Sequence, residues 1–151
     1  MYTLVLVIHS WIRWVALATG IGATVLAMRG SGPSGDSKLE RFGMAFVSLL
    51  DLQLLLGLLL YLVLSPNMVE IRANFGAAMK DPVARFWAVE HLTAMLAAVI
   101  LAHVGRVLAR KAKTPDALRS RLLVCFGLAT VLMIVGMPWP GRPGGRPLLR
   151  V

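Results

Sequence analysis

Four long apolar blocks constrain what this sequence can fold into more than any other feature. They run approximately over 4–28, 42–64, 83–107 and 122–138, and an α-helix needs roughly 20 apolar residues to cross a hydrocarbon core. Of the 151 residues, 58% are hydrophobic and only 15% are charged, whereas a soluble domain carries about a quarter charged residues. We therefore predict an all-α fold, an integral membrane four-helix transmembrane bundle that forms a single domain over residues 1–151, with no separate soluble domain.

Lysine and arginine are unevenly distributed between the loops that connect these blocks. The first and third loops, with their flanks, carry nine of the sixteen basic residues, and the second loop carries three. Cytoplasmic loops are enriched in basic residues, so the bundle is predicted to be N-out and C-out in a bacterial inner membrane. The tryptophans support this orientation, because all four fall near the outer ends of the predicted spans: Trp11, Trp14, Trp87 and Trp139.

The formal net charge of +9 raises the question of a nucleic-acid partner. The basic residues lie at the ends of the apolar blocks, where they act as orientation signals and contact anionic lipid headgroups. The expected partner is therefore the lipid bilayer and not nucleic acid. The single cysteine, Cys125, excludes an intrachain disulfide and a CxxC metal site, and its apolar surroundings indicate a buried packing residue.

Two segments outside the spans carry distinct patterns. In the second loop, apolar side chains recur at the spacings of three and four that are typical of one helix face: Met68, Ile71, Phe75 and Met79. We predict an amphipathic helix over about 68–79 that lies on the outer interface and covers that end of the bundle. The tail over 139–151 is rich in Pro, Gly and Arg, so it is predicted to be extended and non-helical.

Polar side chains within membrane spans are costly and are therefore functional candidates. This sequence has His9, Arg13, Asp51, Gln53, Glu90, His91 and His103. By helical rise, His9 lies roughly 8 Å and His91 roughly 9 Å from the outer ends of their spans. Two imidazoles on different helices at matching depth is the arrangement that a bis-histidine haem needs. We therefore predict a b-type haem whose iron is bound by His9 and His91.

Arg13 and Glu90 are predicted to complete this cofactor site. Arg13 lies one turn below His9, where it could pair with a haem propionate or with Glu90, and Glu90 could orient an imidazole or take up protons. An alternative interpretation requires no cofactor, because His9 could anchor the interface while Arg13 and Glu90 form a structural ion pair. A copper or zinc site formed by His9, His91 and Glu90 is also compatible with these ligand types.

Five segments of the chain resemble a bacterial family of small four-helix membrane proteins that are labelled cytochrome b-like or left uncharacterised. The segments are HSWIRW (9–14), LQLLLGLLLY (52–61), MKDP (79–82), RFWAVEH (85–91) and PWP (138–140). The resemblance spans almost the whole chain, and it implies that His9 and His91 are the recurring histidines, with Arg13 and Glu90 beside them. The chain departs from the family at Asp51, where the resemblance implies a histidine before the LQLLLG element. If that histidine is a ligand in relatives, the ligand set here is reduced or changed.

His103 and Asp51 lie deeper in the predicted bundle. His103 follows His91 by twelve residues, which is roughly 18 Å of helix, and it could bind a second, inner haem together with Met28 or Met44. We favour instead that His103 pairs with Asp51 or faces the cytoplasmic headgroups. Asp51 is expected to face the bundle interior, protonated or paired, because an exposed carboxylate is costly at this depth.

Two classes of function follow from these residues. The first is electron transfer near the outer face of the membrane, with a quinol, a periplasmic electron carrier or an oxygen species as the redox partner. The second is an accessory subunit without a cofactor, either in a larger respiratory or photosynthetic membrane complex or in a homo-oligomer. Its docking surfaces would be the 139–151 tail and an exposed small-residue ridge of Ala16, Gly20 and Thr24. Whether the chain is an oxidoreductase enzyme stays open.

Overall fold

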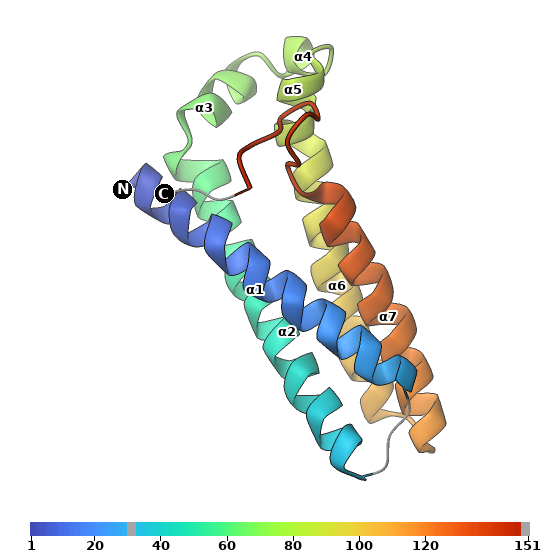
Figure 1. The fold of residues 1–151 in the computed structure, drawn as a ribbon. Helices are drawn as coiled ribbons and strands as arrows, with labels where there is room; N and C mark the ends of the chain where they lie inside the picture. The colour runs from blue at the N-terminus through green and yellow to red at the C-terminus, as the bar shows by residue number, and fades with distance from the viewer. Residues whose placement is uncertain (30–32, 149–151) are drawn as a thin grey trace.

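The computed structural model describes residues 1–29 and 33–148, apart from the side chains of 33–36. Across these described residues the chain is helical without a β-strand, and its long helices form one bundle (Figure 1). Four of the described helices are long and apolar enough to cross a membrane: Tyr2–Arg29, Ser37–Leu64, Pro82–Arg110 and Pro115–Gly136. The predicted all-α four-helix transmembrane bundle is confirmed. The second helix begins at Pro33 and not near Phe42, and the fourth begins at Pro115 and not near Leu122.

The four spans are built in different ways. The first is α1 (Tyr2–Arg29) and the fourth is α7 (Pro115–Gly136). The second joins α2 (Pro33–Leu59) to the π-helical turn η1 (Leu60–Leu64). The third joins three elements, which are α5 (Pro82–Arg85), the π-helical turn η2 (Phe86–Glu90) and α6 (His91–Arg110). Such π-turns within helices are rare and occur frequently at functional sites.

Capping side chains explain where α5 and α7 begin. Asp81 Oδ1 accepts a hydrogen bond from Ala84 N at 2.7 Å, and Thr114 Oγ1 accepts one from Ala117 N at 3.2 Å. In both helices the capping residue is followed directly by proline, whose fixed φ and missing N–H suit the first helical position. These local signals mark where the third and fourth spans begin.

The long helices are arranged as two antiparallel pairs. α1 packs against α2 and also against α7, while α6 packs against α7 and also against α2. In Figure 1 the α1–α2 pair and the α6–α7 pair separate towards one end of the bundle, where the N-terminus and the described part of the tail after α7 lie. We call this the terminal end. It is the end that the distribution of basic residues predicts to face outwards.

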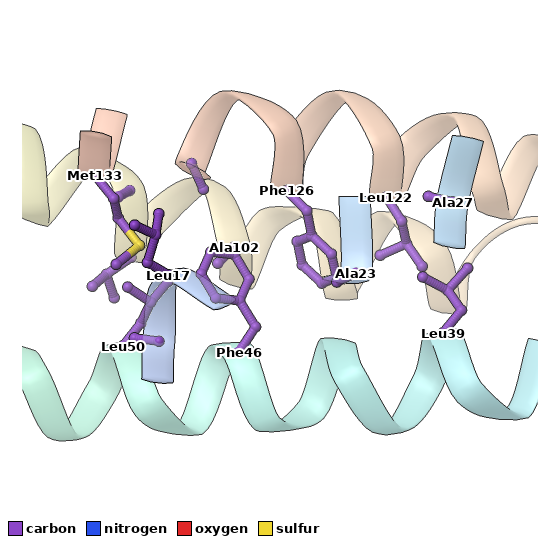
Figure 2. Close-up of a cluster of buried hydrophobic side chains, with 14 of the residues drawn as sticks. Leu17, Ala23, Ala27, Leu39, Phe46, Leu50, Ala102, Leu122, Phe126 and Met133 are labelled. Carbon is purple, nitrogen blue, oxygen red and sulfur yellow. The ribbon is translucent and has the colours of Figure 1, made fainter. Parts of the chain in front are cut away.

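The core is packed from small residues and two facing phenylalanines, which lie in a row of buried side chains along the bundle (Figure 2). Phe46 and Phe126 are fully buried, and their rings meet edge to face with centroids 5.5 Å apart. Gly20 makes room for them, because a Cβ there would lie 2.6 Å from Phe46 Cε2 and 2.8 Å from Thr130 Oγ1. Ala16 is also fully buried. The small-residue ridge therefore packs inside the bundle, and the prediction that it is an exposed docking surface is wrong.

The connection between the second and third spans differs from the single helix predicted over 68–79. It contains two short helices, α3 (Pro66–Ala73) and α4 (Phe75–Ala78), which are separated at Asn74 with φ −135° and ψ 61°. Asparagine weakens helices because its side chain competes for backbone hydrogen bonds. Met68 is buried, as expected for the inner face of this segment, whereas Phe75 is 47% exposed.

The tail after α7 is non-helical in the described residues, as predicted, but it is not extended. Gly141 and Gly144 have positive φ values of 84° and 73°, which glycine adopts without steric cost, and they turn the chain back. Arg146 N then donates a hydrogen bond to Pro138 O at 3.0 Å. The tail thereby crosses the terminal end of the bundle, from the end of α7 towards α1 (Figure 1).

Candidate functional site

A cavity of about 140 Å³ lies where the two helix pairs separate at the terminal end. Helices α1, α2, α6 and α7, the turn η1 and the tail all contribute to its lining. Most of the lining is apolar, and the polar residues include His9, Arg13, Gln53, Tyr61, His91 and Arg146. An apolar cavity with a few converging polar groups is typical of a cofactor or ligand site.

His91 is held by the end of a neighbouring helix. It is the first residue of α6, and its Nδ1 donates a hydrogen bond to Gly136 O at 2.8 Å. Gly136 is the last residue of α7, where backbone carbonyls lack an amide partner within the helix. Because a carbonyl oxygen only accepts, Nδ1 carries the hydrogen and Nε2 keeps its lone pair, which is how metal-binding histidines are oriented. Phe86 and Trp87 pack beside the ring, with centroids 5.9 and 5.5 Å away.

Three buried side-chain atoms in the described residues lack a hydrogen-bond partner: His9 Nδ1, Arg13 Nε and Gln53 Oε1. All three residues line the cavity, although they come from two helices. Buried polar atoms are nearly always satisfied, so their concentration at one cavity points to a polar ligand or water as their partner. The imidazole of His9 lies close to α2, because a Cβ at Gly57 would be 3.4 Å from His9 Cε1.

Arg13 is anchored by the tail. Its Nη2 donates a hydrogen bond to Leu148 O at 3.0 Å, and Trp14 Nε1 donates to the same carbonyl at 3.0 Å. The guanidinium also lies 5.0 Å from the centroid of the Trp14 ring. Arg13 is 9% exposed, and among the described residues it forms no ion pair with a carboxylate. Its positive charge therefore remains available to an anionic group in the cavity.

Glu90 does not line this cavity. Its Oε1 accepts a hydrogen bond from Arg85 Nε at 2.8 Å, and both side chains are about half exposed. Within the described chain, the predicted Arg13–Glu90 pair is therefore not formed, and Glu90 does not orient either imidazole. The copper or zinc hypothesis loses its third ligand for the same reason. No group of three or more His, Cys, Asp or Glu side chains in the described part could hold a metal ion.

Two of the polar contributors to the cavity that were not predicted from the sequence are Arg146 and Tyr61. Arg146 of the tail lines it, and the Arg146 guanidinium lies 5.4 Å from the centroid of the Trp87 ring. The glycines of the tail are a turn signal from which this return of the chain could have been inferred. Tyr61 of η1 also lines the cavity, and its hydroxyl donates to Ala88 O of η2 at 2.9 Å. No pattern in the sequence distinguishes Tyr61 from an interfacial anchor.

His103 and Asp51 lie away from the cavity. His103 Nε2 is 2.8 Å from Asp51 Oδ1, which confirms the predicted pairing. The prediction that Asp51 faces the bundle interior is wrong, because the Asp51 side chain is 45% exposed and that of His103 is 52% exposed. Met28 and Met44, considered as inner haem ligands, are 66% and 47% exposed. With His103 bound to Asp51, the described residues give no support to a second haem.

The donors at the cavity are too few for a bare metal ion but sufficient in number for a metal that brings most of its own ligands. A bare zinc or copper ion takes about three or four protein ligands, whereas the porphyrin of a haem leaves only the axial positions to the protein. The mostly apolar lining holds two imidazoles, His9 and His91, of the type that binds haem iron, and two guanidinium groups, Arg13 and Arg146, of the type that pairs with carboxylates. Comparisons of the chain with protein-family models, curated proteins and solved structures found no match.

Proposed function

We propose that this chain is a membrane b-type haem protein that transfers electrons near the outer face of a bacterial inner membrane. One haem b would lie between α1 and α6, with His9 and His91 as axial ligands. The observation that carries the proposal is the hydrogen bond of 2.8 Å from His91 Nδ1 to Gly136 O. This bond leaves the lone pair of His91 Nε2 able to bind a metal at a cavity that His9 also lines. Metal-binding histidines are oriented in this way.

The polar groups around the cavity support the same cofactor. Arg13 and Arg146 line it from α1 and from the tail, and arginine forms paired hydrogen bonds with carboxylates such as haem propionates. Arg13 Nε and His9 Nδ1 are buried without a partner in the described residues. A ligand that carries carboxylates at one edge and a metal at its centre would address both side chains.

The size of the cavity sets a condition on binding. Its volume of about 140 Å³ is smaller than the roughly 300–1,000 Å³ of typical cofactor pockets. A porphyrin would enter only if lining side chains such as Leu54, Leu92 and Met95 changed rotamer, or if the two helix pairs moved further apart. Methionine and leucine adapt in this way more readily than β-branched residues. The proposal therefore requires the terminal end to widen when the cofactor binds.

The bound group would supply reversible one-electron chemistry. The hydrogen bond to Gly136 would make His91 a stronger and better-oriented donor. The apolar lining would keep water away from the site, and Arg13 and Arg146 would compensate the propionate charge. We retain a quinol, a periplasmic electron carrier and an oxygen species as candidate redox partners.

The accessory-subunit hypothesis has less support. Both docking surfaces on which it depended are engaged within the chain itself, since Gly20 packs against Phe46 and the Leu148 carbonyl accepts from Arg13 and Trp14. It stays the alternative function for a protein that binds no haem.

The test is an absorption spectrum of the protein purified in mild detergent from cells with full haem supply, before and after reduction with dithionite. A Soret band with sharp reduced α-bands is expected for the wild type. His9→Ala and His91→Ala should each lose the low-spin spectrum. A colourless wild-type protein would overturn the proposal.

Two further variants keep this test interpretable. His103→Ala removes a histidine outside the cavity and should leave the spectrum unchanged, which makes it the matched control. His9→Met replaces one axial donor by another that also binds haem iron, and it should shift the α-band and the potential while the protein stays folded. Wild-type spectra for both His9→Met and His91→Ala would place the ligands elsewhere.

A further inference from the structure

A pair of ionisable side chains lies on the outside of the bundle, within the second and third membrane spans. Asp51 of α2 and His103 of α6 are 2.8 Å apart, and their side chains are 45% and 52% exposed. Asp51 is fourteen residues after Ser37 and thirteen before Leu64, the ends of the second span. At the rise of an α-helix Asp51 is therefore roughly 20 Å from either end of its span, whereas His103 is seven residues, roughly 10 Å, from Arg110 at the end of the third span. Both side chains thus lie inside their spans, with Asp51 at the midpoint of the second.

Ionisable groups at this depth normally face the interior of a bundle or a water-filled cavity, because lipid does not solvate them. This pair does neither, since it is half exposed and does not line the cavity at the terminal end. Ser48, one helical turn before Asp51, is also exposed and shares its face of α2. We call Ser48, Asp51 and His103 the midplane patch.

Apolar side chains surround the midplane patch on the same faces of the two helices. On α2 these are Met44, Leu52 and Leu55, and on α6 they are Ile100, Val104 and Val107, all more than a third exposed. The patch therefore lies in an apolar surface that ends towards Arg106 and Arg110, three and seven residues after His103 on α6. In membranes, polar groups of this kind hold helices together by hydrogen bonds across the contact.

The chemistry of the patch indicates which partner fits it. The bond between the side chains uses His103 Nε2 and Asp51 Oδ1, which leaves His103 Nδ1 and Asp51 Oδ2 to reach beyond the pair. For a pair without net charge, Nδ1 carries a hydrogen and Oδ2 accepts. A second copy related by a two-fold axis presents the same donor and acceptor in reverse. Each donor can then meet the acceptor of the other copy, as an isologous interface requires.

We propose that the midplane patch is the contact surface for a second copy of this chain. In the dimer, His103 Nδ1 donates to Asp51 of the partner subunit, and the same bond forms in reverse across the axis. The polar groups of both patches are thereby removed from lipid, while the surrounding leucine, valine and isoleucine side chains pack around them. The inference does not depend on the haem proposal.

Cross-linking in membranes tests the contact directly. In a Cys125→Ala background, Ser48→Cys places a thiol within the midplane patch. The matched control is Val15→Cys, because Val15 is 54% exposed and is thirteen residues after Tyr2 and fourteen before Arg29, at the depth of Asp51 and within one helical turn of the depth of Ser48, on another helix. A short bis-maleimide should link Ser48→Cys into a dimer of this chain and leave Val15→Cys monomeric.

A second variant tests whether the polar side chains themselves stabilise the dimer or only lie near the contact. Asp51→Leu combined with His103→Leu converts the patch to an apolar surface without touching the core, and it should reduce the cross-linked fraction of Ser48→Cys at least fivefold. Photobleaching steps of labelled protein in lipid vesicles should change from two to one. Equal cross-linking of Ser48→Cys and Val15→Cys, or undiminished dimer in the double-leucine variant, would overturn the proposal. Links from Ser48→Cys only to a different polypeptide would overturn it as well.

Discussion

The two histidines of the cavity are held in different ways. His91 is fixed by the Gly136 carbonyl and by the neighbouring rings of Phe86 and Trp87, so its Nε2 has a set direction. His9 has a buried Nδ1 without a partner in the described residues, and it approaches α2 only where Gly57 leaves room. His91 is therefore preorganised, whereas a ligand must position His9. Changes beside His9 should have the larger effect on binding.

Replacing Gly57 tests this asymmetry. A Cβ at this position would already lie 3.4 Å from His9 Cε1, so the longer side chain of Gly57→Leu must occupy the space of the imidazole. We expect haem affinity to fall about tenfold, equivalent to roughly 1.4 kcal/mol, with helix content unchanged. Titration of the haem-free protein with haem, followed at the Soret band, measures the affinity, and circular dichroism measures the helix content.

The matched control for Gly57→Leu is Gly76→Leu. It adds the same side chain at a position where no atom lies within 4 Å of the new Cβ, so wild-type haem affinity is expected. If the two variants bound haem equally well, the cofactor would not lie beside His9 and α1, and the axial pair proposed above would be wrong.

At the scale of elements, the turn η2 decides which side chains of the third span reach the cavity. Glu90, its last residue, pairs outwards with Arg85, while the next residue, His91, bonds to Gly136. The matching depth of His9 and His91 could be predicted, because depth depends only on helical rise. The direction of Glu90 could not, because it depends on a π-turn that is held by tertiary contacts such as Tyr61 to Ala88 and has no local pattern.

The difference between features set by local sequence and features set by tertiary contacts also explains the other differences between the predictions and the structure. The spans could be predicted because lipid forces apolar segments of this length to satisfy their backbone groups as helices. The exposed position of Asp51 could not be predicted, since it depends on the rotation of α2 against α6. The path of the tail depends on two glycines with positive φ and on the contact of Leu148 with Arg13, which lie 135 residues apart in the sequence.

Substitutions at Gly141 and Gly144 of the tail allow the effect of backbone strain to be measured apart from the effect of steric overlap. Both have positive φ, so alanine at either position costs roughly 1–2 kcal/mol of backbone strain. A Cβ at Gly144 would also overlap the Phe86 ring, whereas a Cβ at Gly141 would meet no atom within 4 Å. We expect Gly144→Ala to release the tail from the bundle, with about 1–3 kcal/mol of additional local destabilisation from overpacking. Gly141→Ala should largely keep the tail in place.

Hydrogen exchange measured by mass spectrometry can compare the two variants. The amides of Gly145 and Arg146 donate to Arg142 O and Pro138 O in the wild type, so peptides covering 139–148 should exchange at least tenfold faster in Gly144→Ala than in Gly141→Ala. The same rate in both variants would mean that the packing against Phe86 does not hold the tail.

At the scale of the whole molecule, the membrane-spanning helices carry two separate groups of ionisable side chains. The cavity lies between the helix pairs at the terminal end and is crossed by the tail, whereas the midplane patch faces outwards from α2 and α6. A redox partner would therefore approach along the terminal end, while a second copy would approach from the side. Both contacts could form together, and the direction of the terminal end would decide from which compartment a haem in the cavity could exchange electrons.

That direction can be tested with cysteines at opposite ends of the bundle. Basic residues are concentrated in the first and third loops, which predicts that the terminal end faces the periplasm. In a Cys125→Ala background, Gly76→Cys places a thiol in α4 beside the terminal end, and Lys113→Cys places one in the loop before α7. Both positions are exposed. A membrane-impermeant maleimide should label Gly76→Cys in intact spheroplasts and Lys113→Cys only after permeabilisation. The reverse pattern would place the cavity on the cytoplasmic side, and periplasmic carriers would then be rejected as partners while the bis-histidine site itself would stand.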